Sequence, residues 1–349
     1  MFRQLEDAGL TDIHIGLDAA TGMRAIVAIH STARGPAIGG CRFLHYATEE
    51  AALTDVIRLA RGMSYKAALA DLPHGGGKAV LMRPDRPFDR KALMQAFGRF
   101  VDTLGGRYIT AVDSGSEVSD MDVIAQETRW VSCTSSSGDP SPYTAIGVLS
   151  GIQAFVKAGL GRPTLSGLRV ALQGLGHVGM NLAQKLHEAG AHLVVSDLEQ
   201  SRLDRAVQQF GARVVAPEAI YAVDCDLFCP CGLGAILNEN TIAQLRCRIV
   251  AGSANNQLAR EEDGERLRER GIFYAPDYII NSGGLIQVAM QHAGAPEQAI
   301  IDKIVGVGAT LERLLSDAIR LNLPIEKLAD RLAEQRLLQA GRASQHHAA

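Results

Sequence analysis

The chain has 349 residues, of which 47% are hydrophobic and 21% are charged, and its formal net charge at pH 7 is -3. This length allows two domains of ordinary size, and a mildly acidic chain without a clustered basic face argues against a nucleic-acid partner. The first residues mix both charge signs and no apolar run approaches the ~20 residues that span a bilayer. We therefore expect a cytoplasmic protein with neither a signal peptide nor a membrane anchor.

The first part of the chain predicts strands and helices that alternate around glycine-rich turns. In chain order we expect a strand at 24–30, a turn at 39–40, a helix at 48–70, a turn at 71–77, a strand at 78–82, a helix at 90–104 and a strand at 107–112. Thr48 is the expected N-cap of the first helix, and Glu49 and Glu50 suit the positive end of its dipole.

Two lysines in this part stand in apolar surroundings. Lys78 lies between three glycines and an apolar strand, and Lys66 lies in an apolar helical segment. A lysine enters such surroundings either with a partner or with its ammonium reaching water, and spacing alone leaves both readings open. The glycines before Lys78 do not form a P-loop, because Leu72 and Ala79 stand where that motif needs Gly and Ser or Thr.

The character of the chain changes near residue 140. Segment 134–142 holds almost only turn formers, which predicts a linker, and a helix is expected from Thr144 to Leu165. Strands and helices then alternate, which predicts a parallel sheet with right-handed crossovers. We therefore expect two α/β domains, 1–142 and 143–349, the second a doubly wound, Rossmann-type domain.

The strongest motif follows a buried strand at 168–172. It is a GxGxxG loop that leads into a helix at 180–188 and a second strand at 192–196, which ends at Asp197. The glycines permit a tight turn, a close approach of the backbone to a pyrophosphate, and packing of the helix on the strand. The Asp197 carboxylate can accept hydrogen bonds from the ribose hydroxyls and would repel a 2′-phosphate. NAD is therefore favoured over NADP, with Arg202 as the counter-argument. The motif residues are Gly174, Leu175, Gly176, His177, Val178 and Gly179; of these, His177 faces either the cofactor or solvent.

The six cysteines predict neither a metal site nor a disulfide framework. None forms a CxxC pair, and Cys229-Pro230-Cys231 has no second ligand pair nearby at zinc-finger spacing. We expect reduced, mostly buried thiols and no bound metal.

Several motifs together resemble the Glu/Leu/Phe/Val dehydrogenase family, and most closely its leucine-specific members. The resemblance runs in collinear order from about Gly22 to Glu334. It implies an N-terminal substrate-binding and oligomerisation domain, a Rossmann domain, an active site in the cleft between them, and a last helix at about 325–349 that returns to the first domain. It also implies a homo-oligomer, for which an octamer is one expected state. The motifs are Gly35–Gly40, Gly62–Lys66, Gly75–Lys78, Arg107–Asp113, Asp139–Pro142, Ala251–Gln257 and Tyr274–Tyr278.

The resemblance also implies residue roles in oxidative deamination. Lys66 would hold the substrate α-carboxylate, Lys78 would be the general base that activates water, and Asp113 would exchange protons with the amino group. Thr144 and Asn255 would position the nicotinamide, and Asn256 would lie beside the substrate. A lysine acts as a base only when neutral, which burial and a nearby second cation favour.

Substrate choice turns on an apolar pocket. By resemblance, Ile38 occupies the place of a lysine that pairs with the side chain in glutamate-specific relatives, so a buried glutamate would be unpaired and costly. We expect NAD-dependent, reversible oxidation of L-leucine and other branched-chain L-amino acids to the 2-oxo acid and ammonia. The aromatic alternative, phenylalanine, stays open, as does a non-catalytic NAD-binding sensor or scaffold. The pocket positions are Ile38, Gly39, Ala111, Leu285 and Val288.

Overall fold

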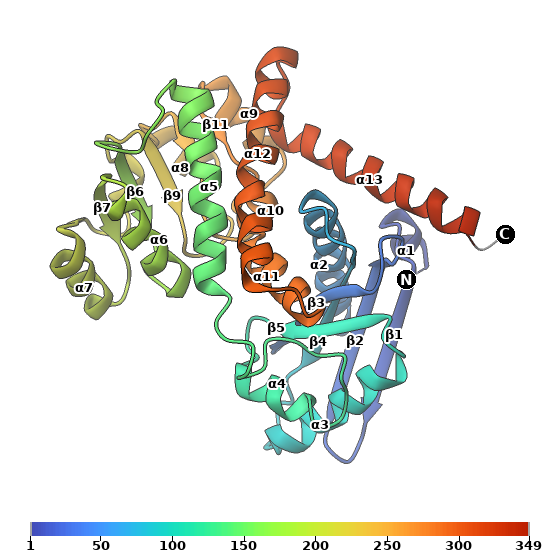
Figure 1. Cartoon of the computed structure of the whole chain (residues 1–349). Helices are drawn as coiled ribbons and strands as arrows, with labels where there is room; N and C mark the ends of the chain where they lie inside the picture. Colours follow the sequence, from blue (N-terminus) through green and yellow to red (C-terminus); the bar gives the residue numbers. More distant parts are fainter. Residues whose placement is uncertain (1, 348–349) are drawn as a thin grey trace. The chain divides into compact units, whose positions relative to one another are not determined.

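The computed structural model describes residues 2–347, and the chain divides into two units between Asp139 and Pro140. Unit 1 holds the residues before this point together with Val288–Gly294 and the segment from Leu332 on. Unit 2 holds Pro140–Gln287 and Ala295–Arg331. Two helices, α11 (Gly283–His292) and α13 (Ile325–His347), therefore contribute residues to both units (Figure 1). Residues 348–349 of the expected last helix lie outside the described residues.

Unit 1 is built on a mixed sheet of five strands in its described part, in the order β1-β2-β4-β3-β5. The pairs β1–β2 and β2–β4 are antiparallel, whereas β4–β3 and β3–β5 are parallel. Helix α2 packs on β2 and β4 with an apolar cluster that includes Val56, Ala60 and Val80. The elements are α1 (Phe2–Asp7), β1 (Asp12–Asp18), β2 (Met23–Ser31), β3 (Ala37–Leu44), α2 (Glu49–Leu69), β4 (Gly75–Met82), α3 (Arg90–Thr103), β5 (Tyr108–Val112) and α4 (Val118–Ile124).

The glycines at 39–40 and 75–77 lie in strands, so the expectation of a turn is wrong there, whereas residues 71–74 do lie between α2 and β4 as expected. Gly39 lies inside β3, and β4 begins at Gly75. A Cβ on Gly39 would lie 1.8 Å from the Gly77 carbonyl oxygen, and one on Gly76 would lie 1.9 Å from the backbone nitrogen of Ser64 in α2. These glycines therefore serve the close approach of neighbouring backbones.

Unit 2 carries a parallel sheet of six strands in its described residues, in the order β11-β10-β9-β6-β7-β8. The order reverses between β6 and β9, which is the doubly wound topology. The expected two-domain α/β fold with a parallel sheet is thus confirmed. The elements are α5 (Ser141–Leu160), β6 (Arg169–Gln173), α6 (His177–Glu188), β7 (His192–Ser196), α7 (Gln200–Phe210), β8 (Arg213–Val214), β9 (Leu227–Pro230), α8 (Glu239–Gln244), β10 (Ile249–Val250), α9 (Glu262–Glu269), β11 (Phe273–Tyr274), α10 (Asp277–Ile280) and α12 (Glu297–Leu321).

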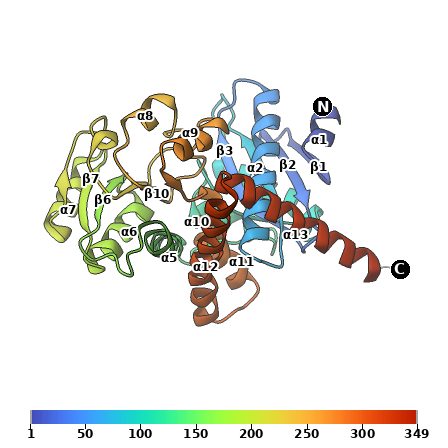
Figure 2. The same ribbon diagram turned by 90° about the horizontal axis from the view of Figure 1, so that it is seen from above.

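Helix α5 begins and ends earlier than the sequence predicts. It starts at Ser141, inside the expected linker, because a proline in the first helical turn loses no hydrogen bond. It ends at Leu160, where Gly161 adopts a left-handed conformation with φ 67°. Among the described residues, α5 is also the one helix that is long and apolar enough to cross a membrane by length and composition alone. It packs side by side with α12 and against α6 (Figures 1 and 2), as a core helix does.

Candidate active site

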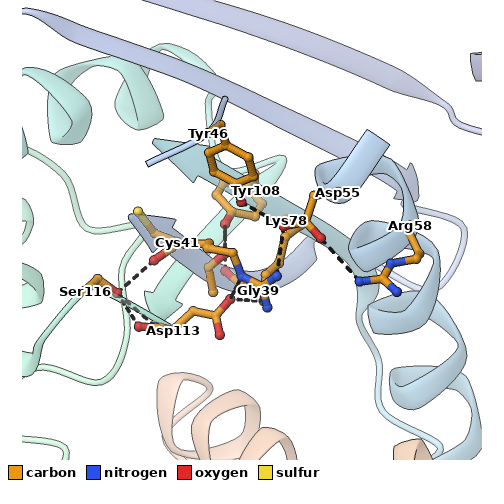
Figure 3. A network of polar contacts seen from close by, with 11 residues as sticks. Gly39, Cys41, Tyr46, Asp55, Arg58, Lys78, Tyr108, Asp113 and Ser116 are labelled. Atoms are coloured by element: carbon orange, nitrogen blue, oxygen red, sulfur yellow. Dashed lines mark hydrogen bonds and ion pairs between the residues drawn. The ribbon is translucent and has the colours of Figure 1, made fainter. Parts of the chain in front are cut away.

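A buried lysine and a carboxylate meet at the centre of the unit 1 sheet. Lys78 lies on β4, two residues from Gly76 and two from Val80, so its side chain shares their face, which α2 covers. Asp113 follows the last residue of β5 directly. The Lys78 ammonium forms an ion pair with the Asp113 carboxylate (Figure 3), and Lys78 as a whole is only 6% exposed. Of the two readings that the sequence leaves open for Lys78, the structure therefore supports a charged partner and not an ammonium that reaches water.

The Asp113 carboxylate is held ionised by two cations. Burial raises the pKa of Asp113, but the positive charges of Lys78 and Arg42 outweigh burial, so the pKa lies below its usual range. Arg42, on β3, places its Nε 3.4 Å from the same carboxylate oxygen, Oδ2, that Lys78 contacts. The site thus contains one carboxylate between two positive charges.

The backbone around Asp113 is fixed to the neighbouring strand. The Asp113 backbone N–H donates to Ser116 Oγ at 2.9 Å, and the Ser116 hydroxyl donates to the carbonyl of Cys41 on β3 at 2.8 Å. The Tyr108 hydroxyl, on β5, donates to the Gly39 carbonyl at 2.7 Å (Figure 3). These bonds tie β5 and its following loop to β3, so the position of Asp113 relative to the sheet is well determined.

The other residues that the sequence assigns to the substrate in unit 1 lie on α2, β3, β5 and α11. Lys66 is partly buried on α2, next to the point where this helix meets β4. Ile38 is fully buried on β3, Ala111 on β5 is 7% exposed and Val288 in α11 is 6% exposed.

The glycine-rich loop of unit 2 has the shape that a dinucleotide requires. Gly174 follows β6 at φ 91°, and a Cβ on Gly179 would lie 2.0 Å from the Gly174 carbonyl oxygen. A Cβ on Gly176 would meet no atom within 4 Å, so the space above this residue, at the N-terminus of α6, is open to a ligand. Leu175 and Val178 complete the loop, and His177, the first residue of α6, is exposed. The loop lies at the strand-order reversal, where doubly wound sheets bind ligands, so these residues fit a dinucleotide.

Asp197 follows β7 and is held beside this loop. Its carboxylate accepts the backbone N–H of Leu175 at 2.6 Å and that of Glu199 at 2.8 Å. Arg202 Nη1 lies 3.6 Å from the carboxylate. A carboxylate has about four acceptor positions, so two remain for ribose hydroxyls.

The residues assigned to the nicotinamide gather around segment 281–285. The Asn281 amide donates to Asn255 Oδ1 at 2.8 Å, and a Cβ on Gly284 would lie 2.6 Å from Thr144 Oγ1. Asn256 adopts a left-handed conformation with φ 52°, which asparagine tolerates better than most residues. Leu285, in the same segment, is partly buried.

Sequence reasoning missed Arg42 and Asn281. Arg42 stands two residues after Gly40, on the same face of β3, and its alternation with the quoted glycines was the available signal. Asn281 directly follows α10 and is only 6% exposed, which is unusual for an asparagine side chain. Among the side chains that the structure describes (residues 3 and 5–342), no group of three or more His, Cys, Asp or Glu could hold a metal, and the cysteines are free thiols.

Comparison with known proteins agrees with this geometry. Residues 10–130 match the family model "Glu/Leu/Phe/Val dehydrogenase, dimerisation domain", and residues 196–303 match "Glutamate/Leucine/Phenylalanine/Valine dehydrogenase". Leucine dehydrogenase of Bacillus subtilis is 46% identical over 97% of this chain and 94% of its own length. Valine dehydrogenase of Streptomyces virginiae is 41% identical over 96% of each chain.

A solved structure extends the comparison to the fold. The crystal structure of L-tryptophan dehydrogenase from Nostoc punctiforme superimposes with a TM-score of 0.88 at 41% identity, covering 98% of this chain and 100% of that one. The three relatives act on different amino acids by their names, so the family is shared while the substrate differs. The chain belongs to the Glu/Leu/Phe/Val dehydrogenase family of amino-acid dehydrogenases.

Proposed function

We propose that the protein catalyses the NAD-dependent, reversible oxidative deamination of L-leucine and other branched-chain L-amino acids to the 2-oxo acid and ammonia. The observation that carries the proposal is the buried ion pair between Lys78 and Asp113, in a chain that also folds a dinucleotide loop. A non-catalytic NAD-binding protein has no need for a buried lysine and carboxylate in contact, because burying charge is costly.

The two domains expected from the sequence have separate roles in this proposal. Residues 1–142 bind the amino acid and build a homo-oligomer, octameric by family resemblance, and residues 143–349 bind NAD. The match of residues 10–130 to a model described as a dimerisation domain supports the first assignment. The open space at Gly176 supports the second. We place the protein in the cytoplasm, in agreement with its free thiols.

The residues of unit 1 carry the proton chemistry. Lys66 holds the substrate α-carboxylate, and Asp113 accepts a proton from the substrate ammonium, which frees the nitrogen lone pair. When bound, NAD would supply the acceptor for the hydride that leaves Cα. Lys78, in its neutral form, then removes a proton from the water that attacks the imino carbon, and Asp113 returns a proton to the departing amine. As ammonia departs, the carbinolamine hydroxyl releases its proton to solvent. With NAD+ as the hydride acceptor, one amino acid and one water would thus give the 2-oxo acid, ammonia, NADH and two protons, one of which Lys78 has taken from the water.

The residues of unit 2 orient the cofactor. Thr144 and Asn255 position the nicotinamide, and Asn256 lies beside the substrate. The loop from Gly174 to Gly179 offers the backbone N–H groups at the start of α6 to the pyrophosphate. The backbone N–H of Leu175 in this loop donates to the Asp197 carboxylate, and this bond holds the carboxylate that is proposed to bind the ribose beside the loop.

The apolar side chains proposed to meet the substrate predict the order of substrates. Ile38, Ala111 and Val288 in unit 1 and Leu285 in unit 2 carry no charge, so we expect kcat/KM for leucine to exceed that for phenylalanine and tryptophan by about tenfold or more, with valine between. A panel of these amino acids, followed by nicotinamide absorbance at alkaline pH, measures the order. The L-tryptophan dehydrogenase relative makes an aromatic substrate the specific competitor, and a larger kcat/KM for phenylalanine or tryptophan would replace leucine in the proposal. No turnover with any apolar amino acid would reject the enzyme assignment.

The carboxylate of Asp197 predicts the choice of cofactor. Asp197→Asn removes the charge that repels a 2′-phosphate, so the preference for NAD over NADP, as a ratio of kcat/KM values, should fall about tenfold. Glu199→Gln is the matched control, because this carboxylate is exposed and only two residues away. The control should keep the parental ratio. An unchanged ratio in Asp197→Asn would show that another feature selects the cofactor.

A further inference from the structure

A chain of polar contacts leads away from Asp113 to helix α2. Arg42 Nη1 donates to Asp55 Oδ2 at 2.8 Å, and the Tyr46 hydroxyl donates to the same oxygen at 2.7 Å. The other side of the Arg42 guanidinium faces Asp113, with Nε at 3.4 Å from Oδ2. Arg42 thus lies between a carboxylate of the reaction and a carboxylate of α2 (Figure 3 shows Asp55, Tyr46 and Asp113).

The network is shielded from water, so its charges act strongly on one another. The side chains of Arg42, Asp55 and Asp113 are 18%, 17% and 19% exposed. The Arg42 Nε is buried and has no hydrogen-bond partner among the described residues, so it faces Asp113 as a charge rather than as a bonded donor. In contrast, the side chain of Arg58, which lies 3.4 Å from the other oxygen of Asp55, is 66% exposed.

The ionisation states of the network are settled by its neighbours. Burial raises the pKa of Asp55, but the Tyr46 hydroxyl and Arg42 together lower it below its usual range. Burial lowers the pKa of Arg42, but Asp113 and Asp55 outweigh burial and raise it. Arg42 therefore carries its full positive charge at any pH at which the protein is folded.

We propose that Arg42 is a positioning residue for the reaction: clamped by Asp55 and Tyr46, its guanidinium fixes the Asp113 carboxylate beside Lys78 and adds a positive charge to that site. The inference rests on the proposed roles of Lys78 and Asp113. A fixed positive charge opposes proton uptake by its neighbours, so the sign of its effect is the same whichever member of the Lys78–Asp113 pair takes the proton.

Of the groups that face Asp113 in unit 1, Lys78 and Arg42 carry the positive charges, and the others are neutral. Lys78 comes from β4 and Arg42 from β3. The Cys41 thiol on β3 and the Tyr108 hydroxyl on β5 lie close enough to interact with Asp113, and burial raises the pKa of both, so both stay neutral. The negative charge of Asp120 on α4 also raises the pKa of Cys41, and this carboxylate forms an ion pair with Arg90 of α3 at 2.6 Å.

The test is the pH profile of kcat/KM for leucine from about pH 6 to about pH 11 in Arg42→Gln. Without the cation, protons bind the site more readily, so the acid limb should move to higher pH. We expect kcat/KM to fall about tenfold more at the acid end than at the alkaline end. Arg42→Lys should keep the acid limb near its parental position but lower kcat, because an ammonium cannot reach two carboxylates as a guanidinium does.

Arg58→Gln is the matched control, since it removes an arginine from the same Asp55 without touching Asp113. It should leave the profile unchanged. A parental profile in Arg42→Gln, or an equal loss at every pH, would overturn the inference, and a lower melting temperature alone would mark Arg42 as a structural clamp. If Arg42→Gln does not fold, parental kcat in Arg42→Lys overturns it instead. Turnover that survives Lys78→Ala would reject the proposed function itself. If Lys78→Ala is inactive but the acid limb of Arg42→Gln stays at its parental pH, only this inference is rejected.

Discussion

Replacement of Lys78 by alanine should lower kcat for leucine about 10²- to 10⁴-fold, the range that general acid–base catalysis contributes. The loss follows from the geometry, because Lys78 is buried on β4 and its ammonium contacts only one carboxylate of the site, that of Asp113. Binding of NAD, measured by calorimetric titration, should stay near the parental value, because the glycine loop belongs to the other unit.

Two further variants sharpen this result. Lys91→Ala removes an exposed lysine of α3 in the same unit and should keep parental kcat. Asp113→Asn should also lose turnover, and the double variant with Lys78→Ala should be little slower than the slower single variant, because the two groups act as a unit. A Lys78→Ala enzyme that keeps more than about a tenth of kcat would show that Lys78 is not the base.

A single methyl group on Gly76 should destabilise unit 1 severely. Its Cβ would lie 1.9 Å from the Ser64 backbone nitrogen and 2.4 Å from its Cα, and no rotamer change relieves a contact with backbone. We expect Gly76→Ala to lower the free energy of unfolding by about 3 kcal/mol or more, the upper end for overpacked cores. Guanidinium unfolding followed by circular dichroism measures the change.

The control for Gly76 is a glycine on the opposing helix. Gly62 lies within α2, and a Cβ there would meet no atom within 4 Å. Gly62→Ala should therefore raise the free energy of unfolding by up to about 1 kcal/mol, because alanine favours the helix. If both variants unfolded at the parental guanidinium concentration, the contact between α2 and β4 would be looser than the structure indicates.

Features that depend on local pattern were predictable from the sequence. Strand β7 has the bounds that its apolar run predicts, and Thr48 caps α2, with its hydroxyl accepting the Ala51 N–H at 3.1 Å. The GxGxxG loop also has its expected context, with a strand before it and a helix after it. In each case the residues that decide the structure are neighbours in the chain.

Features that depend on distant contacts were not predictable. A glycine that makes a turn and a glycine that admits a neighbouring backbone look alike in a sequence, which is why Gly39 and Gly76 were placed in turns. The alternation of Arg42 with Gly40 is a local signal, but it does not identify the partners of Arg42, because Asp55 and Asp113 come from α2 and from the end of β5. Charged side chains find such partners only once the sheet and helix are assembled.

The close approach of α2 to β4 at Gly76 has a consequence for evolution. Since backbone meets backbone there, the spacing between the elements that carry Lys66 and Lys78 cannot drift by gradual changes of side-chain size. If the proposed roles hold, a lineage that adopts a new amino acid would keep this contact and vary apolar positions elsewhere in unit 1, such as Ala111. Relatives named for leucine, tryptophan and valine are 46%, 44% and 41% identical to this chain, so the named substrate differs among members that share the family.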